Sequence, residues 1–343
     1  MVKNKFKEWK IGNSINQGGQ GQIFLATNKN YEGKQFILKK LINIGRIARF
    51  KDEIKAGLEL DHPNIIKVVD YDYENNSPFI VTEYYPIGTL EDFRLDKLTF
   101  EEKLVIFRKI VEAVAFAHEN NVIHRDLKPE NIFLNNKLEP VIGDFGLCFF
   151  SDDGNRVTIT SEAVGSRYYM APELADGRID EVPYSADIYS LGKIFYWILT
   201  GVIFDREKHR APNYDITKIN PQREFFLIND FLDNMIVEDH NKRFTDAKHA
   251  LKEFNSLNQR IRMGANLVDP DVPQTCIYCG SGQYKKVKYV KDGIIPMTAA
   301  EYYFNFRKLE EDNWTFLWCD KCNNIQFFHP LFKGETDKWK KKK

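Results

Sequence analysis

The sequence predicts an α+β chain with a strand-rich beginning, a helical middle and a small cysteine-rich module near the C-terminus. Three observations support this prediction. Short apolar runs separated by turn residues fill the chain as far as Tyr85, as expected for β-strands. After Thr99, apolar residues recur at helical spacing. Near the C-terminus, two C-x-x-C pairs favour a metal site over disulfides in a chain without a secretion signal.

The composition limits the classes of function. The chain has 343 residues, enough for two or three compact units, and 43% of them are hydrophobic, so a substantial core can form. The formal net charge of +0 gives no global attraction to nucleic acid or to a membrane surface. The N-terminal residues contain no apolar stretch and no run of about 18 apolar residues occurs. We therefore expect no signal peptide, no membrane partner and a cytoplasmic location.

The first predicted strands flank a glycine cluster near the N-terminus. Glycine lets the backbone approach phosphate oxygens and present N–H groups to them. In the pattern G-x-G-x-x-G-x-V, Gly18 and Gly21 occupy the second and third glycine positions and Ile23 the valine position. Asn16 replaces the first glycine, and asparagine tolerates left-handed backbone better than most residues. An ordinary glycine-rich hairpin is the alternative interpretation.

The next apolar run, Gln35–Leu41, is typical of a strand and contains two candidate phosphate-binding lysines, Lys39 and Lys40. Either lysine, considered alone, could be a solvated strand end. The elements expected after it are a helix over Phe50–His62, strands over Ile65–Val69 and Phe79–Thr82, and a helix that starts with a capping-box pattern at Thr99 and Glu102 and ends near Asn120.

The loop from His124 to Asn131 reads H-R-D-L-K-P-E-N and carries a carboxylate, a cation and an amide, on Asp126, Lys128 and Asn131. Phosphoryl transfer needs this set. A carboxylate orients and deprotonates the attacking hydroxyl, a cation holds the migrating phosphate, and an amide oxygen helps to hold Mg²⁺. The triplet D-F-G follows at Asp144, whose carboxylate is another hard oxygen ligand of the kind that Mg²⁺ prefers.

These motifs, together with A-P-E at Ala171–Glu173, resemble in kind, order and spacing those of protein kinases. The resemblance covers about Trp9 to Arg262. It implies a bilobal protein-kinase fold, with a β-rich N-lobe over residues 9–85 and a helical C-lobe over residues 86–262. Lys128, two residues after the loop aspartate, resembles serine/threonine kinases rather than tyrosine kinases. The implied activity is transfer of the γ-phosphate of ATP to hydroxyl groups of a protein substrate.

The resemblance implies a role for each residue of the catalytic site. Asp126 would position and deprotonate the hydroxyl, and Lys128 would neutralise the γ-phosphate. Lys39 would align ATP and would itself be held by Glu53 of the helix that follows the strand. The implied Mg²⁺ ligands are Asn131 and Asp144.

The resemblance also implies a nucleotide site. Thr82 matches the gatekeeper position, Glu83 and Tyr84 match the hinge whose backbone would bond to adenine, and Phe133 would lie beneath the adenine ring. The implied nucleotide-binding residues are Asn16, Gly18, Gly21, Ile23, Ile37, Lys39, Thr82, Glu83, Tyr84 and Phe133.

Two features concern regulation. Gly57, one turn after Glu53, stands where the family usually has a large apolar residue. This predicts either a looser helix that needs an activating event or compensation by a neighbouring side chain. In the family, Arg125 pairs with a phosphate on the activation loop, and we expect autophosphorylation there. The candidate phosphosites are Thr158, Thr160 and Ser161.

The resemblance predicts several supporting contacts in the helical lobe. Asp187 would brace the backbone of the catalytic loop, and Arg243 would pair with Glu173. We expect Cys148 to be a small buried hydrophobe. The segment from Gly192 to Arg243 is short for the family, so we expect trimmed substrate-docking helices.

The C-terminal module follows a linker over residues 263–273 that contains glycine and prolines. Its four cysteines form two hooks, Cys276 with Cys279 and Cys319 with Cys322, and four thiolates suit tetrahedral Zn²⁺. A thioredoxin-like redox pair is the alternative, but the βαβ context is missing. Residues 274–332 therefore resemble a zinc ribbon, and residues 333–343 form a basic tail. The strands expected in the ribbon are Tyr284–Val290, Trp314–Trp318 and Ile325–Phe328.

The function of the module leaves alternatives open. We favour docking of a protein partner that recruits substrates, and the lysines between residues 285 and 291 offer nucleic-acid binding as the less favoured choice. The alternative to an active enzyme is a pseudokinase-like scaffold, or a nucleic-acid-sensing module, that acts through the ribbon. A kinase of small molecules or nucleic acids is a third hypothesis. Loss of Lys39, Asp126 or Asp144 would indicate a scaffold, and none is lost.

Overall fold

The computed structural model describes residues 6–17, 21–74, 76–150, 168–175, 182–220 and 223–265, together with five short strands between residues 284 and 328 and residue 321. The chain divides into two compact units, Met1–Phe254 and Asn255–Lys343.

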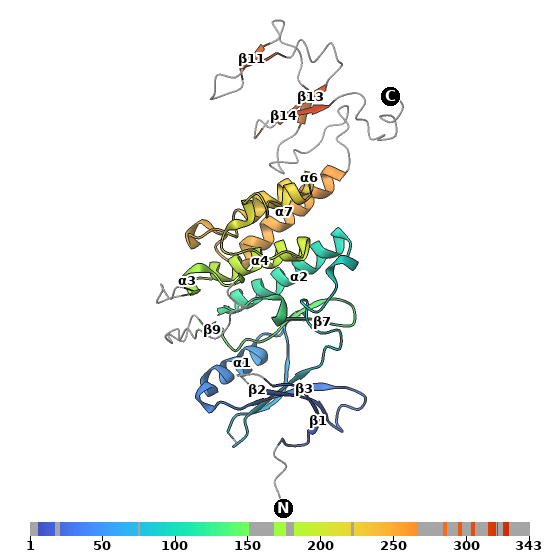
Figure 1. Cartoon of the computed structure of the whole chain (residues 1–343), viewed down its shortest axis with the longest axis vertical. Coiled ribbons are helices and arrows are strands. Elements are labelled where there is room, and N and C mark those ends of the chain that lie inside the picture. The colour runs from blue at the N-terminus through green and yellow to red at the C-terminus, as the bar shows by residue number, and fades with distance from the viewer. Residues whose placement is uncertain are drawn as a thin grey trace, which may run out of the picture. The chain divides into compact units, whose positions relative to one another are not determined.

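The first unit begins with an antiparallel sheet and one helix, α1 (Ile47–Glu59), beside it (Figure 1). The described strands of this sheet have the order β1-β2-β3-β5-β4. Their bounds are β1 (Lys10–Gln17), β2 (Gly21–Thr27), β3 (Phe36–Leu41), β4 (Val68–Asp72) and β5 (Phe79–Glu83). The β-rich first lobe is thus confirmed.

Strand β3 shows why the sheet has a core face and a cleft face. Successive side chains of a strand point to opposite sides. Phe36 and Leu38 are 2% and 0% exposed and pack with Trp9 and Phe79 in an apolar cluster. Lys39 therefore faces the other side of the sheet, and Lys40 shares the side of Leu38.

The fourth strand and the first helix differ from their predicted bounds. Strand β4 starts at Val68, not at Ile65. The apolar residues before it bond instead to a strand of the second lobe, where Ile66 N–H donates to the Ile142 carbonyl at 2.8 Å and Ile142 N–H donates to the Asn64 carbonyl at 2.8 Å. Helix α1 starts at Ile47 and ends at Glu59, because Leu60 leaves the helical backbone region.

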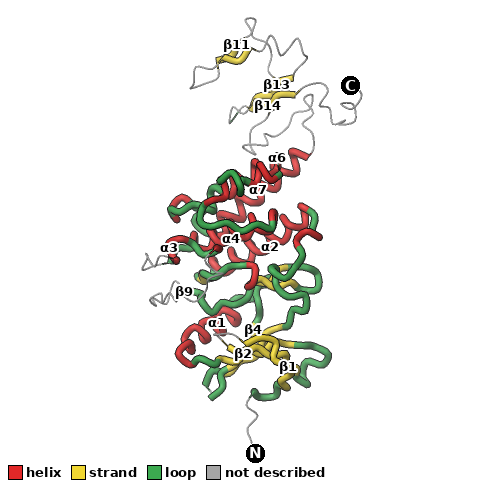
Figure 2. The backbone as a smooth tube through the Cα atoms, in the orientation of Figure 1, coloured by secondary structure: helices red, strands yellow, loops and turns green. Residues whose placement is uncertain are grey.

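The second lobe is built mainly from helices. Figure 2 shows them in red, and the strands of the sheet in yellow. Its central helix is α4, in which most side chains are buried, and Phe195 of α4 stacks on Phe107 of α2 with ring centroids 4.1 Å apart. The predicted capping box of α2 is confirmed, since Thr99 and Glu102 each accept the other's backbone N–H. The helices are α2 (Phe100–Glu119), α3 (Pro172–Ala175), α4 (Ser185–Thr200), α5 (Ile216–Ile219), α6 (Arg223–Leu232) and α7 (Ala247–Ala265).

Two short strand pairs carry the loops that bear the catalytic motifs. β6 (Val122–Ile123) pairs with β9 (Phe149–Phe150), and β7 (Ile132–Leu134) pairs with β8 (Pro140–Ile142). The loop from His124 to Asn131 therefore starts and ends on paired strands, which fixes both of its ends.

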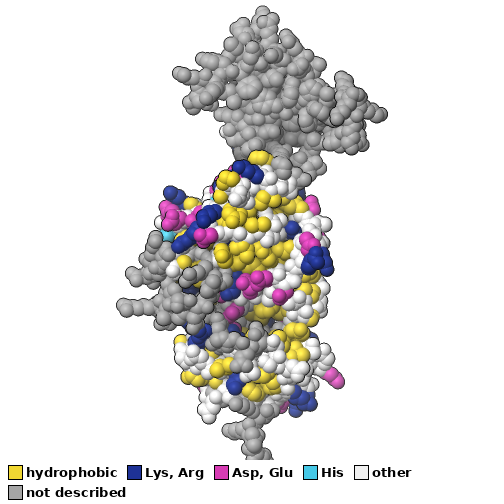
Figure 3. Space-filling view, in the orientation of Figure 1, with side chains coloured by type: hydrophobic (Ala, Val, Ile, Leu, Met, Phe, Trp, Pro, Cys, Tyr) yellow, Lys and Arg dark blue, Asp and Glu magenta, His cyan; other side chains and the backbone are white. Residues whose placement is uncertain are grey.

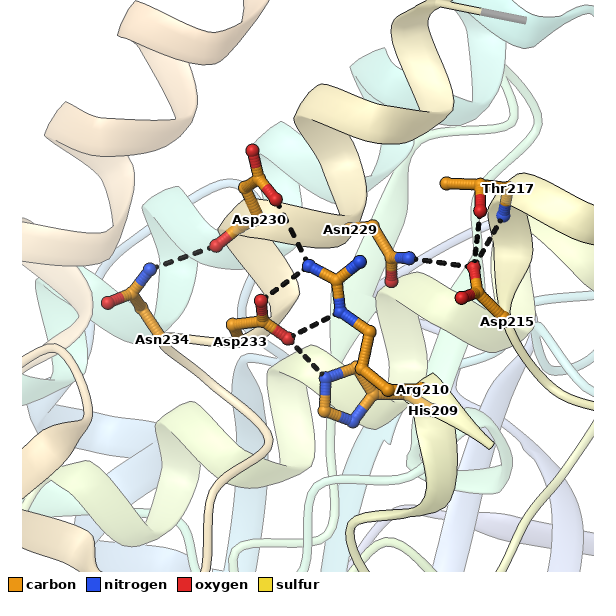
Figure 4. A network of polar contacts seen from close by, with 8 residues as sticks. All are labelled: His209, Arg210, Asp215, Thr217, Asn229, Asp230, Asp233 and Asn234. Carbon is orange, nitrogen blue, oxygen red and sulfur yellow. Dashed lines mark hydrogen bonds and ion pairs between the residues drawn. The ribbon is translucent and has the colours of Figure 1, made fainter. Parts of the chain in front are cut away.

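The connection between α4 and α6 is short, as expected for trimmed docking helices. In its described residues, its helical parts are a 3-10 turn, Lys208–Arg210, and the single turn of α5. Figure 4 shows how polar contacts hold it to α6 and the residues after that helix. The Arg210 guanidinium donates to Asp233 Oδ1 at 2.8 Å and to Asp230 Oδ1 at 3.0 Å, and His209 Nε2 lies 2.8 Å from Asp233 Oδ1.

The second unit contains described strands from a small sheet and a separate pair. The sheet has the order β10-β13-β14, and β11 pairs with β12. Their bounds are β10 (Tyr284–Lys286), β11 (Ile294–Pro296), β12 (Tyr303–Asn305), β13 (Thr315–Cys319) and β14 (Ile325–Phe328). Strands are thus present in all three segments where the sequence predicts them. The predicted linker begins inside α7, which continues to Ala265.

The surface agrees with a balanced composition. On the described part of the face in Figure 3, basic and acidic side chains are interspersed. Among the described residues, no helix has the length and apolarity that crossing a bilayer requires.

Candidate active site

The catalytic loop gathers its three polar side chains around one carboxylate. Asp126 is 8% exposed, and Lys128 Nζ donates to its Oδ2 at 2.8 Å. Asn131 Nδ2 donates to the Asp126 carbonyl at 2.8 Å and to Asp126 Oδ2 at 3.1 Å. This arrangement fixes the carboxylate, and it leaves the Asn131 side-chain oxygen as a potential cation ligand.

A buried carboxylate of α4 holds the backbone of this loop. Asp187 is 0% exposed and accepts the backbone N–H groups of His124 and Arg125, each at 2.8 Å. His118 Nε2 lies 2.9 Å from the same carboxylate. Burial alone would raise the pKa of Asp187, but these hydrogen bonds outweigh burial and lower it. The predicted bracing contact is confirmed, and it holds Arg125 at φ 67°, a conformation that non-glycine residues rarely adopt.

A lysine of β3 links α1 to the D-F-G motif. Lys39 Nζ lies 2.9 Å from each carboxylate oxygen of Glu53 and 3.5 Å from Asp144 Oδ1. Burial would lower the pKa of Lys39, but the carboxylates of Asp144 and Glu53 raise it above its ordinary value. The Lys39 ammonium in turn lowers the pKa of Asp144, against the effect of burial. The cleft therefore holds a fixed cation beside a fixed carboxylate.

Lys39, Glu53 and Asp144 line one cavity of about 430 Å³. Of the sequence-predicted nucleotide residues, its lining includes Gly21, Ile23, Ile37, Lys39, Thr82 and Phe133. Glu53, Asn131 and Asp144 also line it. The volume suits a small molecule held between apolar walls with a few convergent charges.

Other predicted nucleotide residues lie elsewhere. Glu83 and Tyr84 line a separate hollow and are not among the residues that line this cavity. The next residue, Tyr85, stacks on Phe133 with ring centroids 5.7 Å apart. Gly18 and the side chain of Asn16 lie outside the described residues; Asn16 pairs with Ile23 in the sheet.

Several residues that line the cavity were not predicted from the sequence. Ile66, Val68, Ile80, Glu130 and Phe145 also face the cavity. The alternation of side chains along the fourth and fifth strands could have indicated Val68 and Ile80, but apolar strand residues usually signal nothing beyond a core.

Two oxygen-bearing side chains could hold a magnesium ion. Asn131 and Asp144 line the same cavity, and the depressed pKa of Asp144 keeps it ionised. Mg²⁺ prefers one or two such hard oxygen ligands together with phosphate oxygens and water. Asp144 is held at φ 55°, so its backbone is strained at the position where the chemistry needs it.

The glycine of α1 is compensated by a neighbour. A Cβ atom added to Gly57 would lie 2.4 Å from Val68 Cγ2, so the side chain of Val68 fills the space beside the glycine. The Lys39–Glu53 pair is formed in this structure. Compensation by a neighbouring side chain is thus the alternative that the geometry favours.

The start of the activation segment contacts the catalytic loop. The Arg125 guanidinium donates to the carbonyl oxygens of Leu147 and Cys148. Cys148 is 5% exposed, which confirms the expected small buried hydrophobe, and burial raises the pKa of its thiol. Thr158, Thr160 and Ser161 lie outside the described residues.

The A-P-E glutamate makes its predicted ion pair. Arg243 Nη1 and Nη2 donate to the two Glu173 carboxylate oxygens at 2.7 and 2.9 Å. Both residues are buried, and the guanidinium lies 5.0 Å from the ring centre of Tyr189 of α4.

The predicted zinc ligands fall almost wholly outside the described structure. Cys276, Cys279 and Cys322 lie outside it, and of Cys319 only the backbone, at the end of β13, is described. Among the described residues, no group of three or more histidine, cysteine or acidic side chains could hold a metal ion. The zinc site stays a prediction.

Comparisons with known proteins give the family of the first unit. A family model described as "Protein kinase domain" matches residues 9–254. Serine/threonine protein kinase OSK3 of Oryza sativa subsp. indica is 28% identical over 323 residues, which cover 87% of this chain and 61% of that protein. OSK4 of the same subspecies is 32% identical over 254 residues, covering 70% and 48%.

A third relative, the carbon catabolite-derepressing protein kinase of Secale cereale, is 32% identical over 285 residues, covering 78% of this chain and 55% of that protein. The chain thus spans roughly half to three fifths of the length of these curated relatives. Because the family model matches well over half of the chain, this chain belongs to the protein kinase domain family.

Proposed function

We propose that this chain is a serine/threonine protein kinase that transfers the γ-phosphate of ATP to hydroxyl groups of a protein substrate. The observation that carries this proposal is the convergence of Lys39, Glu53 and Asp144 in one cavity, next to the Asp126–Lys128 pair. The names of the curated relatives, which are serine/threonine protein kinases, support the same class.

Each charged group has a defined task in this reaction. Asp126 accepts the proton of the substrate hydroxyl and directs the oxygen at the phosphorus. Lys128, 2.8 Å from Asp126, neutralises charge on the migrating phosphate. Lys39 binds the remaining phosphates, and Glu53 keeps its ammonium in place. Such fixed charges stabilise the transition state without reorganisation.

The proposed magnesium ligands are Asn131 and Asp144. When bound there, Mg²⁺ would neutralise phosphate charge that develops during transfer. Thr82 and Phe133 line the cavity where the adenine would bind.

The test is phosphate transfer from radiolabelled ATP by the purified chain, alone and with a protein extract, followed by phosphoamino-acid analysis. We expect phosphoserine and phosphothreonine, and we expect Asp126→Asn to abolish transfer while nucleotide binding survives. Asp96→Asn, at an exposed aspartate of the same lobe, is the matched control and keeps activity. Equal activity of Asp126→Asn and the wild type would contradict the proposal, and transfer to a small molecule or nucleic acid would replace it. The pseudokinase alternative predicts no transfer by the wild type.

We also propose autophosphorylation on Thr158, Thr160 or Ser161, with Arg125 binding the phosphate. Arg125 lies beside the start of this segment through its contacts with Leu147 and Cys148, which supports the role. Mass spectrometry of the chain after incubation with ATP identifies the site. The same sites should be absent from the Asp126→Asn variant.

We propose that residues 9–262 form a kinase domain and that residues 274–332 form a zinc ribbon. The backbone register supports it, since Tyr284, which follows the first cysteine pair, pairs with Cys319 of the second. Cys279 precedes Tyr284 by five residues, a reach of at most ~17 Å. Elemental analysis should find one zinc per chain, lost in Cys276→Ser.

We propose that this module docks a protein partner, and that the location of the chain is cytoplasmic. Removal of residues 274–343 should lower the phosphorylation of a protein substrate far more than that of a short peptide. A loss of nucleic-acid binding instead would favour the nucleic-acid alternative.

A further inference from the structure

Helix α1 lies against β4 at the point where Gly57 faces Val68. A Cβ atom on residue 57 would lie 2.4 Å from Val68 Cγ2, 3.4 Å from Val68 Cβ and 3.5 Å from the Val68 backbone nitrogen. Carbon atoms in contact are about 3.5–4.0 Å apart. Even alanine at position 57 would therefore need a relative displacement of roughly 1 Å.

Val68 has little freedom to move aside. It is 6% exposed and packs with the apolar side chains of Leu41, Phe50, Ile54 and Ile80. Its β-branched side chain has few alternative rotamers, and its backbone belongs to the paired strand β4. The helix is therefore the part that would move.

Residues at the start of the activation segment also contact α1 and resist its movement away from β4. Cys148 Sγ lies 3.9 Å from the Asp52 carbonyl oxygen, and Lys55 Nζ lies 3.9 Å from the ring centre of Phe150. The helix is thus held between these contacts and β4, and the Gly57–Val68 contact sets how closely it approaches the sheet.

This position decides whether Glu53 reaches Lys39. Residues four apart lie on the same helical face, so Glu53 and Gly57 face the sheet together. The Lys39–Glu53 distance is 2.9 Å, and both of these side chains and Val68 line the same cavity. A displacement of about 1 Å at Gly57 would lengthen the ion pair beyond hydrogen-bond range.

We propose that Gly57 and Val68 are a matched pair: the missing side chain on α1 and the valine on β4 together place Glu53 against Lys39. Gly57 is then a positioning residue for the phosphate-binding lysine. The inference rests on the proposed function, because it assigns the ion pair to phosphate transfer.

The first test measures kcat/KM for a peptide substrate in four variants. Gly57→Ala should lower it roughly 100-fold, as small misplacements of catalytic groups do. Val68→Ala removes a cavity-lining group and should lower it less. The double variant Gly57→Ala/Val68→Ala should recover at least about tenfold over Gly57→Ala, because the shortened side chain makes room. Leu58→Ala, at the next position and 51% exposed, is the control and should match the wild type.

The rescue separates positioning from a general structural role, since two independent defects would add. Wild-type kcat/KM in Gly57→Ala, or a double variant no better than Gly57→Ala, would overturn the proposal. Alanine is also the better helix former, which offsets part of the packing cost of the added Cβ, so Gly57→Ala should remain folded at the assay temperature.

The second test does not depend on catalysis. In a crystal structure of Gly57→Ala, the Lys39–Glu53 distance should exceed 3.5 Å, and it should return to hydrogen-bond range in the double variant. A pair that stays at 2.9 Å in Gly57→Ala would overturn the inference even if the enzyme is active. Absence of phosphate transfer by the wild type would contradict the proposed function and leave this measurement valid.

Discussion

Two lysines, one in each lobe, differ in what their surroundings do to their charge: the side chain of Lys39 is 18% exposed and lies in the cleft, whereas Lys193 is buried in the helical lobe. Lys39 lies between the carboxylates of Glu53 and Asp144, which raise its pKa above its ordinary value. Lys193 of α4 is 3% exposed, donates to the carbonyl oxygens of Phe204 and Arg206, and lies 3.5 Å from the ring centre of Phe204. Burial lowers the pKa of Lys193 to about 7.

The difference lies in the partners. Two carboxylates make a permanent cation that can receive a polyanion. Carbonyl oxygens and an aromatic ring hold a lysine that only anchors the connection after α4. The charge of Lys39 in the cleft is therefore available to a ligand, whereas Lys193 in the helical lobe only stabilises the fold.

The largest expected effect comes from removing the cleft lysine. Lys39→Met should lower kcat/KM by roughly 100- to 1000-fold, the loss expected for one charge-stabilising donor, with little change in melting temperature. Lys193→Met is the matched control in the other lobe and should keep activity within about threefold. Similar activity losses in the two variants would break the comparison.

The second effect extends the comparison to carboxylates. Glu53 pairs with a cation in the cleft, whereas Glu173 pairs with Arg243, whose side chain is 0% exposed. Glu173→Ala leaves a buried guanidinium without its carboxylate and should lower the free energy of unfolding by about 3–5 kcal/mol.

Urea denaturation measures this loss, with Glu112→Ala, from the exposed Arg108–Glu112 pair on α2, as the control. The control should change stability by less than about 0.5 kcal/mol. A loss below about 1 kcal/mol for Glu173→Ala would show that Arg243 keeps enough partners in its backbone carbonyl contacts.

The third effect is a pH dependence that Lys193 alone should cause. Its folded pKa of about 7 is below the ordinary value of 10.5, so between these values the unfolded chain binds a proton that the folded chain does not. The free energy of unfolding therefore rises with pH across this window, by up to about 1.4 kcal/mol per pH unit.

The measurement is urea denaturation of the wild type and Lys193→Met at pH 6, 7, 8 and 9. The difference between the two curves should be flat below pH 7, where Lys193 is charged in both states, and should favour the wild type increasingly above it. A constant difference across the series would place the folded pKa of Lys193 near its ordinary value.

Much of the fold was readable because its signals are local. The α2 stripe with its Thr99 cap and the strands around the glycine cluster depend on periodicity and neighbouring residues. Strand β4 was misplaced because the backbone groups of Asn64 and Ile66 bond to Ile142, far away in the sequence. An apolar run shows that it will be buried, but it does not identify the partner.

The site shows the same limit. The loop around Asp126 and the triplet at Asp144 are each contiguous in the sequence, so both motifs could be found from it, and the structure brings Asn131 of the loop and Asp144 to one cavity. Val68 looks like any core valine, and its closeness to Gly57 depends on how α1 docks against β4. Such clearances arise only when elements pack, and no local pattern encodes them.

The smallest expected effect concerns the polar network that holds the α4–α6 connection. Burial opposes ionisation of Asp233, but hydrogen bonds from Arg210 and His209 lower its pKa to about 2. The side chains of Arg210 and Asp233 are 38% and 43% exposed, so solvent screens the pair. Arg210→Ala should therefore lower the free energy of unfolding by about 1 kcal/mol or less.

In 1 M salt the difference in the free energy of unfolding between this variant and the wild type should shrink, because the pair is accessible to ions. Unlike the buried Lys193, this network should show a salt dependence. A loss larger than that of Glu173→Ala would mean that the exposed network, rather than the buried pair, anchors this part of the helical lobe.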